Sequence, residues 1–161
     1  LLIMANLTGY AQTFDSDTSV VDTSAKTTVL TRAFDSAGNE YIYLKGVAST
    51  IVGSVVTYDE DGVTTLLVAN AIGPVAVSMS ITDSTSEWGW KQIWGEAEAC
   101  VAANTADNAH LGFETTAGYV GDGKAAGDEI SGMISREAVT TAGVYTIQVT
   151  YPWASDSLGG S

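Results

Sequence analysis

The sequence contains a single cysteine and a single histidine among its 161 residues, and this scarcity excludes several kinds of site. One thiol cannot form an intramolecular disulfide, so we expect Cys100 to be a small buried apolar side chain. His110 and Cys100 together are too few to assemble an ordinary zinc site. No Gly-x-Ser-x-Gly motif marks a nucleophilic serine that His110 would serve. The sequence therefore predicts a protein that is not an enzyme, without a bound metal or cofactor.

Basic side chains are also scarce, because six lysines and arginines stand against nineteen aspartates and glutamates, for a net charge of −13. DNA and RNA are bound through basic groups that displace counterions, so we expect no nucleic-acid partner. Anionic membrane surfaces are disfavoured for the same reason. Long hydrophobic runs are missing as well, since residues 64–71 are too few to span a bilayer. We interpret Met4 as a natural start after residues 1–3, and we expect no signal peptide and assembly in the host cytoplasm.

Carboxylates are the remaining candidates for ligand chemistry. Asp15 and Asp17 are separated by one residue, and Asp59-Glu60-Asp61 is continuous. Calcium accepts several oxygens from a flexible loop, but neither cluster continues with the further ligands and the distal glutamate of a calcium-binding loop. We therefore interpret both clusters as turn-forming residues on a solvated acidic surface.

Short runs of β-branched and aromatic residues, separated by glycine turns, follow one another from residue 38 onward. In the clearest case, residues 54–58 and 63–69 flank Asp59-Glu60-Asp61-Gly62, which predicts a tight hairpin. Further strands are expected at residues 41–44, 75–81, 88–101, 111–115, 119–120, 129–135 and 144–151. This spacing predicts an all-β fold, a small β-barrel or β-sandwich that occupies residues 38–161.

Residues 1–37 show no sustained period, and we expect them to form an irregular N-terminal arm or edge segment. Such a segment is either an arm ordered by a partner or a pair of edge strands, and the arm is favoured slightly. Residues 5–14 carry three large apolar side chains, Leu7, Tyr10 and Phe14. Our hypothesis is that this stretch binds the major capsid protein discussed below or a neighbouring subunit, gaining contact area at the cost of ordering entropy.

The segment from Trp88 to Val101 carries three of the four tryptophans. Its later part has helical propensity, but the β-rich context favours a strand. In an unbroken strand, Trp88, Trp90 and Trp94 share one face with charged residues, and the opposite face is small and apolar. Two interpretations remain open. In the first, a bulge at Gly95 places the tryptophans in the core. In the second, at least one of them anchors a contact with another subunit. Trp153 either covers an end of the barrel or joins that contact.

Five motifs, taken in order over residues 38–151, resemble tailed-bacteriophage capsid decoration (cement) proteins. They are Gly38-Asn39-Glu40-Tyr41-Ile42-Tyr43-Leu44-Lys45-Gly46-Val47, Gly53-Ser54-Val55-Val56-Thr57-Tyr58-Asp59, Val68-Ala69-Asn70-Ala71-Ile72-Gly73-Pro74-Val75-Ala76-Val77, Trp88-Gly89-Trp90-Lys91-Gln92-Ile93-Trp94-Gly95 and Ala126-Gly127-Asp128-Glu129-Ile130-Ser131-Gly132. The resemblance lies in their combination and order rather than in any one of them.

This resemblance implies a structural virion protein that binds the capsid exterior and stabilises the head against the pressure of the packaged genome. It implies the major capsid protein of a tailed phage as partner, together with copies of the chain itself as a trimer or dimer. It implies no catalytic residues. The alternatives are another virion component, such as a head-fibre base, and a carbohydrate-binding β-sandwich that uses Trp88, Trp90 or Trp94 as a sugar platform. A hydrolase is the least favoured.

Overall fold

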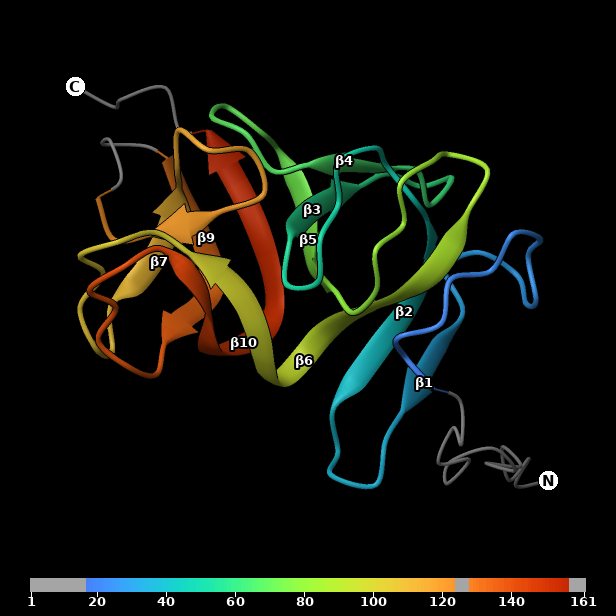
Figure 1. Ribbon diagram of the computed structural model, residues 1–161, viewed down its shortest axis with the longest axis horizontal. Coiled ribbons are helices and arrows are strands. Elements are labelled where there is room, and N and C mark those ends of the chain that lie inside the picture. The colour runs from blue at the N-terminus through green and yellow to red at the C-terminus, as the bar shows by residue number, and fades with distance from the viewer. Residues whose placement is uncertain (1–16, 124–127, 157–161) are drawn as a thin grey trace, which may run out of the picture.

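The computed structural model describes residues 17–123 and 128–156, and this part of the chain is built from β-strands and irregular segments without a helix. The ten strands form one continuous sheet in the order β1-β2-β6-β8-β7-β9-β10-β5-β3-β4 (Figure 1). The predicted all-β class is therefore confirmed. Leu7, Tyr10 and Phe14, the apolar residues expected on an N-terminal arm, lie outside the described residues.

Nine of the ten strands overlap the strand segments expected from residue 38 onward. The three-residue β1 lies within residues 1–37, for which a pair of edge strands was the alternative to an arm. The strands are β1 (Arg32–Phe34), β2 (Glu40–Lys45), β3 (Val55–Tyr58), β4 (Thr64–Leu66), β5 (Gly73–Ser78), β6 (Trp88–Val101), β7 (His110–Phe113), β8 (Val120–Gly121), β9 (Asp128–Ser135) and β10 (Gly143–Asp156). The run with helical propensity belongs to β6, as the β-rich context predicted.

The sheet folds into two lobes that share the long strand β6 (Figure 1). In the barrel lobe, the C-terminal half of β6 pairs with β10, β10 with β9, β9 with β7 and β7 with β8. The ring closes where β8 pairs with β6 in parallel, at Val120 and Val101. Small and β-branched side chains such as Ala97, Ala99 and Ile147 fill the interior, as a narrow barrel requires.

The N-terminal lobe uses the first half of β6, which pairs with β2 on one side and β5 on the other. Strands β3 and β4 continue from β5, and the amide of Lys45 at the end of β2 donates to the carbonyl of Gly62 at 3.0 Å. This bond connects the β3–β4 turn to the end of β2, so the sheet of this lobe curls almost into a second barrel. Its apolar core includes Ile42, Leu44 and Val56.

The predicted hairpin joins β3 and β4, and its acidic residues form the turn. Asp59 Oδ1 accepts hydrogen bonds from the amides of Asp61 and Val63, at 3.0 and 2.9 Å. Gly62 has a φ of +66°, which a glycine adopts without steric cost. One carboxylate of this acidic cluster is therefore occupied in holding the turn.

β6 changes partners close to Gly95, which has a φ of +103°. A β-carbon at Gly95 would lie 1.9 Å from Asn39 Oδ1, so the turn before β2 occupies the space where a side chain would be. The ladder with β2 is shifted beside this point, because Glu40 pairs with Trp94 whereas Tyr41 pairs with Gln92. A bulge therefore exists, but its extra residue is Ile93 rather than Gly95, where one of the two interpretations placed it. The bulge reverses the faces of β6 between Gln92 and Trp94.

Candidate functional site

The bulge separates the tryptophans that an unbroken strand would place on one face. Trp90 is almost fully buried and packs with Tyr41 and Tyr43, and Trp88 is partly buried against the same cluster. Trp94 lies on the opposite face of the sheet and is 39% exposed. Trp153, on β10, is 50% exposed. The unbroken-strand interpretation, in which Trp88, Trp90 and Trp94 share a face, is therefore wrong. The bulge interpretation holds for Trp88 and Trp90, which belong to a buried cluster, but not for Trp94, so the structure contains two aromatic surfaces.

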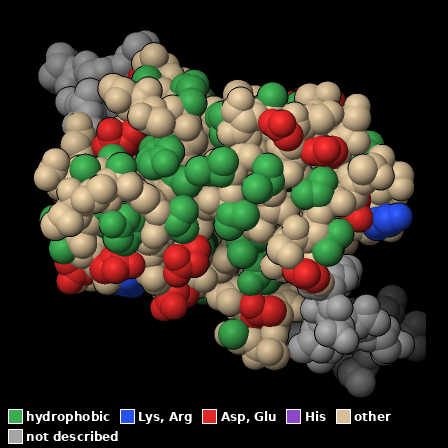
Figure 2. Space-filling model, in the orientation of Figure 1, with side chains coloured by type: hydrophobic (Ala, Val, Ile, Leu, Met, Phe, Trp, Pro, Cys, Tyr) green, Lys and Arg blue, Asp and Glu red, His purple; other side chains and the backbone are tan. Residues whose placement is uncertain are grey.

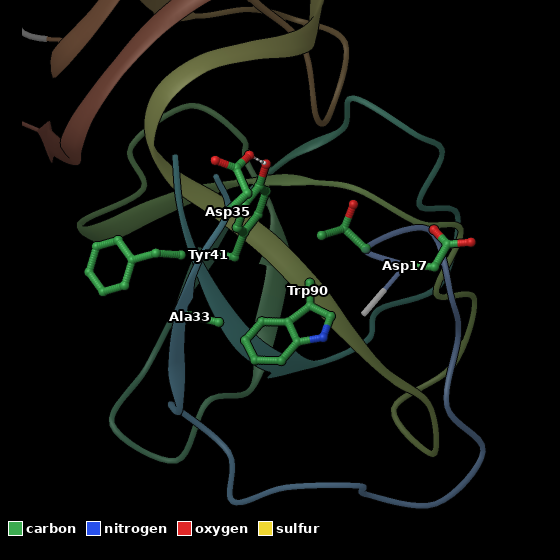
Figure 3. Close-up of a pocket in the computed structure, with 7 residues that line it drawn as sticks. Asp17, Ala33, Asp35, Tyr41 and Trp90 are labelled. Carbon is green, nitrogen blue, oxygen red and sulfur yellow. Dashed lines mark hydrogen bonds between the residues drawn. The ribbon is translucent and has the colours of Figure 1, made fainter. Parts of the chain in front are cut away.

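The first surface surrounds Trp90 and has two hollows of about 260 and 210 Å³. Figure 3 shows one of them, with the Trp90 ring between Ala33 and Asp17. Asp17 lines both hollows, and Val20 and Tyr43 line the second. We call this surface the Trp90 face, defined by Asp17, Val20, Ala33, Tyr43 and Trp90. Its apolar floor and open rim would accept side chains of a partner.

Two phenols beneath the Trp90 face are held by carboxylates. Tyr41 OH donates to Asp35 Oδ2 at 2.9 Å, and Tyr43 OH donates to Asp22 Oδ2 at 2.6 Å. Burial, together with these bonds to carboxylates, raises the pKa of both Tyr41 and Tyr43 to about 12. Burial alone would raise the pKa of Asp35, but hydrogen bonds from Asn39, Tyr41 and Ala37 outweigh it and lower that pKa. Tyr41, Tyr43 and Asp35 therefore keep fixed protonation states at neutral pH, and the hydrogen bonds of the two phenols position the aromatic rings.

Strand β1 borders the Trp90 face and is the terminal strand of the sheet. In the part of the chain that the structure describes, no further strand pairs with its outer edge, so its backbone is available to an added strand. The chain enters this region at Asp17, directly after residues 1–16. The Trp90 face, the strand edge and the start of the described chain therefore lie together.

The second surface is a row of exposed aromatic rings across neighbouring strands. Phe34 on β1 pairs with Glu40 on β2, and Glu40 pairs with Trp94 on β6, so the three side chains share one face. The ring of Trp94 packs on Tyr151 of β10, with centroids 5.0 Å apart. Phe34, Tyr151 and Trp153 are each about half exposed. We call Phe34, Trp94, Tyr151 and Trp153 the aromatic strip.

A charge pair between buried Glu40 and half-exposed Arg32 anchors the aromatic strip. Glu40 is 2% exposed and accepts hydrogen bonds from Arg32 Nη1, at 3.1 Å, and from Tyr151 OH. The Arg32 guanidinium also lies 5.8 Å from the centre of the Tyr151 ring, within cation–π range. Burial and the nearby carboxylate of Glu40 raise the pKa of Tyr58, against the opposing effect of Arg32. The charges therefore neutralise each other beside the exposed rings.

A cleft of about 250 Å³ opens beside the strip, between the two lobes. Tyr151, Pro152 and Trp153 line it from the barrel lobe, and Arg32, Tyr58 and Pro74 line it from the N-terminal lobe. The sequence pointed to Trp94 and Trp153 but not to Arg32, Glu40, Tyr58 or Tyr151. Their contacts join positions up to 111 residues apart, and the one local signal was the triplet Tyr151-Pro152-Trp153.

The sequence also singled out Cys100 and His110, and the structure shows where each of them lies. Cys100 is buried beneath the segment that carries Val52, and burial raises the pKa of its thiol. His110 is exposed as the first residue of β7. Within residues 17–123 and 128–156, no three His, Cys, Asp or Glu side chains are arranged to hold a metal ion. No helix in that part of the chain is long and apolar enough to cross a membrane.

The surface is acidic on both lobes, with apolar side chains gathered across the middle of the view in Figure 2. No protein-family model, curated protein or solved structure matches this chain. The two aromatic surfaces are therefore interpreted from their geometry and from the order of the sequence motifs.

Proposed function

We propose that this protein is a structural component of a tailed-phage virion that binds the outer surface of the capsid and stabilises the head. It acts by binding alone, with the major capsid protein as partner and with copies of itself as a dimer or trimer. The order of motifs over residues 38–151 supports the family. The observation that carries the proposal is the Trp90 face, where apolar hollows lie beside an unpaired strand edge.

The strand edge gives the partner a mode of attachment. An extended segment of the major capsid protein adds to β1 through backbone hydrogen bonds and places alternate side chains over the hollows. Asp17 and Asp22 outnumber Lys26 around the second hollow, and this excess of negative charge favours a segment that carries basic side chains. Residues 5–14 precede Asp17 closely enough in the chain to extend the same contact.

The charge of the protein favours the outside of the shell. A net charge of −13 opposes contact with packaged DNA, which is itself a dense polyanion. Many copies on equivalent lattice positions need only modest individual affinity, because each adds its own stabilisation to the shell. The proposal therefore requires a rigid body with one well-formed contact rather than a catalytic centre.

The test is binding of the full-length chain to emptied, expanded heads of the phage that encodes it. Val20 is 48% exposed and lines a hollow, so Val20→Asp places a charge in the apolar contact. We expect at least about tenfold weaker binding, because desolvating an unpaired carboxylate costs more than 1.4 kcal/mol. The matched control is Val144→Asp on the barrel lobe, where valine is 44% exposed.

Wild-type and Val144→Asp proteins should bind the heads alike. Failure of the wild-type protein to bind would refute the proposed function. Equal binding by the Val20→Asp variant would refute the Trp90 face as its contact. A chain that lacks residues 1–14 is expected to bind more weakly than the full-length chain, and equal binding would remove the arm from the proposal.

A further inference from the structure

The interlobe cleft and the rings of Trp94, Tyr151 and Trp153 do not line the hollows of the Trp90 face. The two surfaces meet at β1, because Phe34 at the end of the strip lines one of those hollows. Trp153 and Tyr151 leave about half of their surface in solvent although each belongs to a paired strand. Large aromatic rings stabilise a fold when they are buried, so exposing several of them together forgoes that stabilisation. Neighbouring exposed rings of this kind mark a binding surface.

Tyr151 is held in a conformation that L-residues rarely adopt. Its φ is +47°, and it lies in the irregular part of β10 between Val149 and Trp153. Such a backbone is unfavourable and persists only where the surrounding contacts enforce it. Here the enforcing contacts are the hydrogen bond to Glu40 and the packing against Trp94. The ring is therefore fixed before any ligand arrives, which lowers the entropy cost of binding.

The charges near the cleft restrict the ligand. Arg32 is paired with buried Glu40, so the site carries no net charge to attract an anion. A cationic ligand would be repelled by the guanidinium of Arg32, which is half exposed and lies over the Tyr151 ring. Arg32 directs one of its five N–H donors to Glu40 through Nη1, and its exposed side chain and the Tyr58 hydroxyl provide polar groups at the rim. A neutral ligand with many hydroxyl groups satisfies all of these conditions.

We infer that the interlobe cleft and the aromatic strip bind a neutral saccharide. A pyranose ring has a face of C–H groups that packs on an aromatic ring and a rim of hydroxyls that hydrogen-bonds to polar side chains. The cleft volume of about 250 Å³ lies just below the usual range for small-molecule pockets and fits one sugar unit. Trp94 and Phe34 continue the strip beyond the cleft, so further units of an oligosaccharide lie along it.

The structure thus moves the carbohydrate interpretation to different residues. Trp90 is buried and Trp88 is partly covered, so neither offers an open ring face. The platform consists instead of Trp153, Tyr151 and Trp94, with Phe34 at its end. A peptide is the competing ligand. On the barrel lobe the cleft offers it no unpaired strand, because Trp153 pairs with both β5 and β9, and the open strand edge beside the cleft is that of β1.

The experiment exposes the full-length protein to neutral oligosaccharides of glucose, galactose, mannose and N-acetylglucosamine, three to five units long. Saturation-transfer NMR detects binding, and tryptophan fluorescence measures Kd. We expect at least one oligosaccharide to bind with a Kd below about 1 mM, as suits a small site. Trp153→Ala should weaken that binding about tenfold, and Trp153→Phe, which keeps a ring, should restore most of it.

Val20→Asp, on the Trp90 face, should leave saccharide binding unchanged. The inference is overturned if no oligosaccharide binds at 10 mM, or if Trp153→Ala binds as tightly as the wild type. It is also overturned if a proline-rich peptide of ten residues binds the strip and the sugars do not. Loss of head binding in Trp153→Ala would assign the strip to the capsid instead. Because Val20→Asp and Trp153→Ala report on different surfaces, this inference and the proposed function can fail separately.

Discussion

Replacing Lys91 with methionine removes a buried ammonium group and keeps an unbranched side chain. Lys91 is fully buried in the N-terminal lobe, and its Nζ donates to Thr82 Oγ1 at 3.0 Å. Among the described residues no carboxylate forms an ion pair with this ammonium, and burial is the cause of its altered pKa. The side chain therefore carries a charge into the protein interior with a single hydroxyl as its identified partner.

Burial lowers the pKa of Lys91 from 10.5 to about 8. The difference corresponds to a cost of about 3 kcal/mol for holding the charged amine in the folded protein at neutral pH. Lys91→Met removes this cost but leaves the Thr82 hydroxyl without its donor, which costs about 1 kcal/mol. We therefore expect the variant to be more stable than the wild type by about 2 kcal/mol at pH 7.

The effect depends on pH in a defined direction. Below pH 8 the amine is protonated in both states, and the full cost of burial is present. Between pH 8 and 10.5 the unfolded chain keeps a proton that the folded chain has lost, so this group raises stability by about 1.4 kcal/mol per pH unit. The advantage of Lys91→Met should shrink over that interval. Comparing the two proteins removes the common effect of Cys100, Tyr41 and Tyr43, whose raised pKa values lower stability at alkaline pH.

The assay is urea unfolding followed by tryptophan fluorescence at pH 7, 8, 9 and 10. Lys26→Met replaces an exposed lysine and is expected to unfold like the wild type at every pH. Two results would refute the reasoning. One is a Lys91→Met variant that is no more stable than the wild type at pH 7. The other is an advantage that stays constant from pH 7 to 10.

Three further predictions concern the bulge, the buried carboxylate of Glu40 and the thiol. Gly95→Ala should cost about 3 kcal/mol or more of stability in urea unfolding, because its β-carbon would overlap Asn39. Gly38→Ala, with a φ of +87° and open space around it, should cost only about 1 kcal/mol, and equal costs would contradict the overlap. Tyr151→Phe should cost about 2 kcal/mol by removing a donor to buried Glu40, whereas Tyr145→Phe should cost little; similar losses would disprove the role of that bond. Cys100 should react with a thiol reagent at pH 8 far more slowly in the native protein than in urea, and equal rates would show that it is accessible.

The strands could be predicted because their signals are local. β6 has the limits that its sequence predicted, and the Asp-Gly turn predicted the β3–β4 hairpin. β1 was not predicted as a distinct strand because three residues give no measurable alternation. A bulge in β6 was one of two open interpretations, but the sequence placed it at Gly95, whereas its extra residue is Ile93.

The candidate sites depend on contacts between distant segments, which no local pattern reports. Glu40 is held in the interior by Arg32 of the neighbouring strand and by Tyr151, which lies 111 residues further along the chain. Trp90 and Trp94 differ in exposure because a shift in pairing turns them to opposite faces. Lys91, between Trp90 and Gln92, gives no sign in the sequence that it points into the N-terminal lobe.

The proposed function rests on binding to assembled heads, and the mass of the protein in solution tests it most directly. Sedimentation velocity of the full-length chain should give a dimer or trimer when the protein is alone. When emptied, expanded heads are added, a saturable fraction should move with them, in a fixed number of copies per head. A monomer whose boundary is unchanged by the heads would contradict the account.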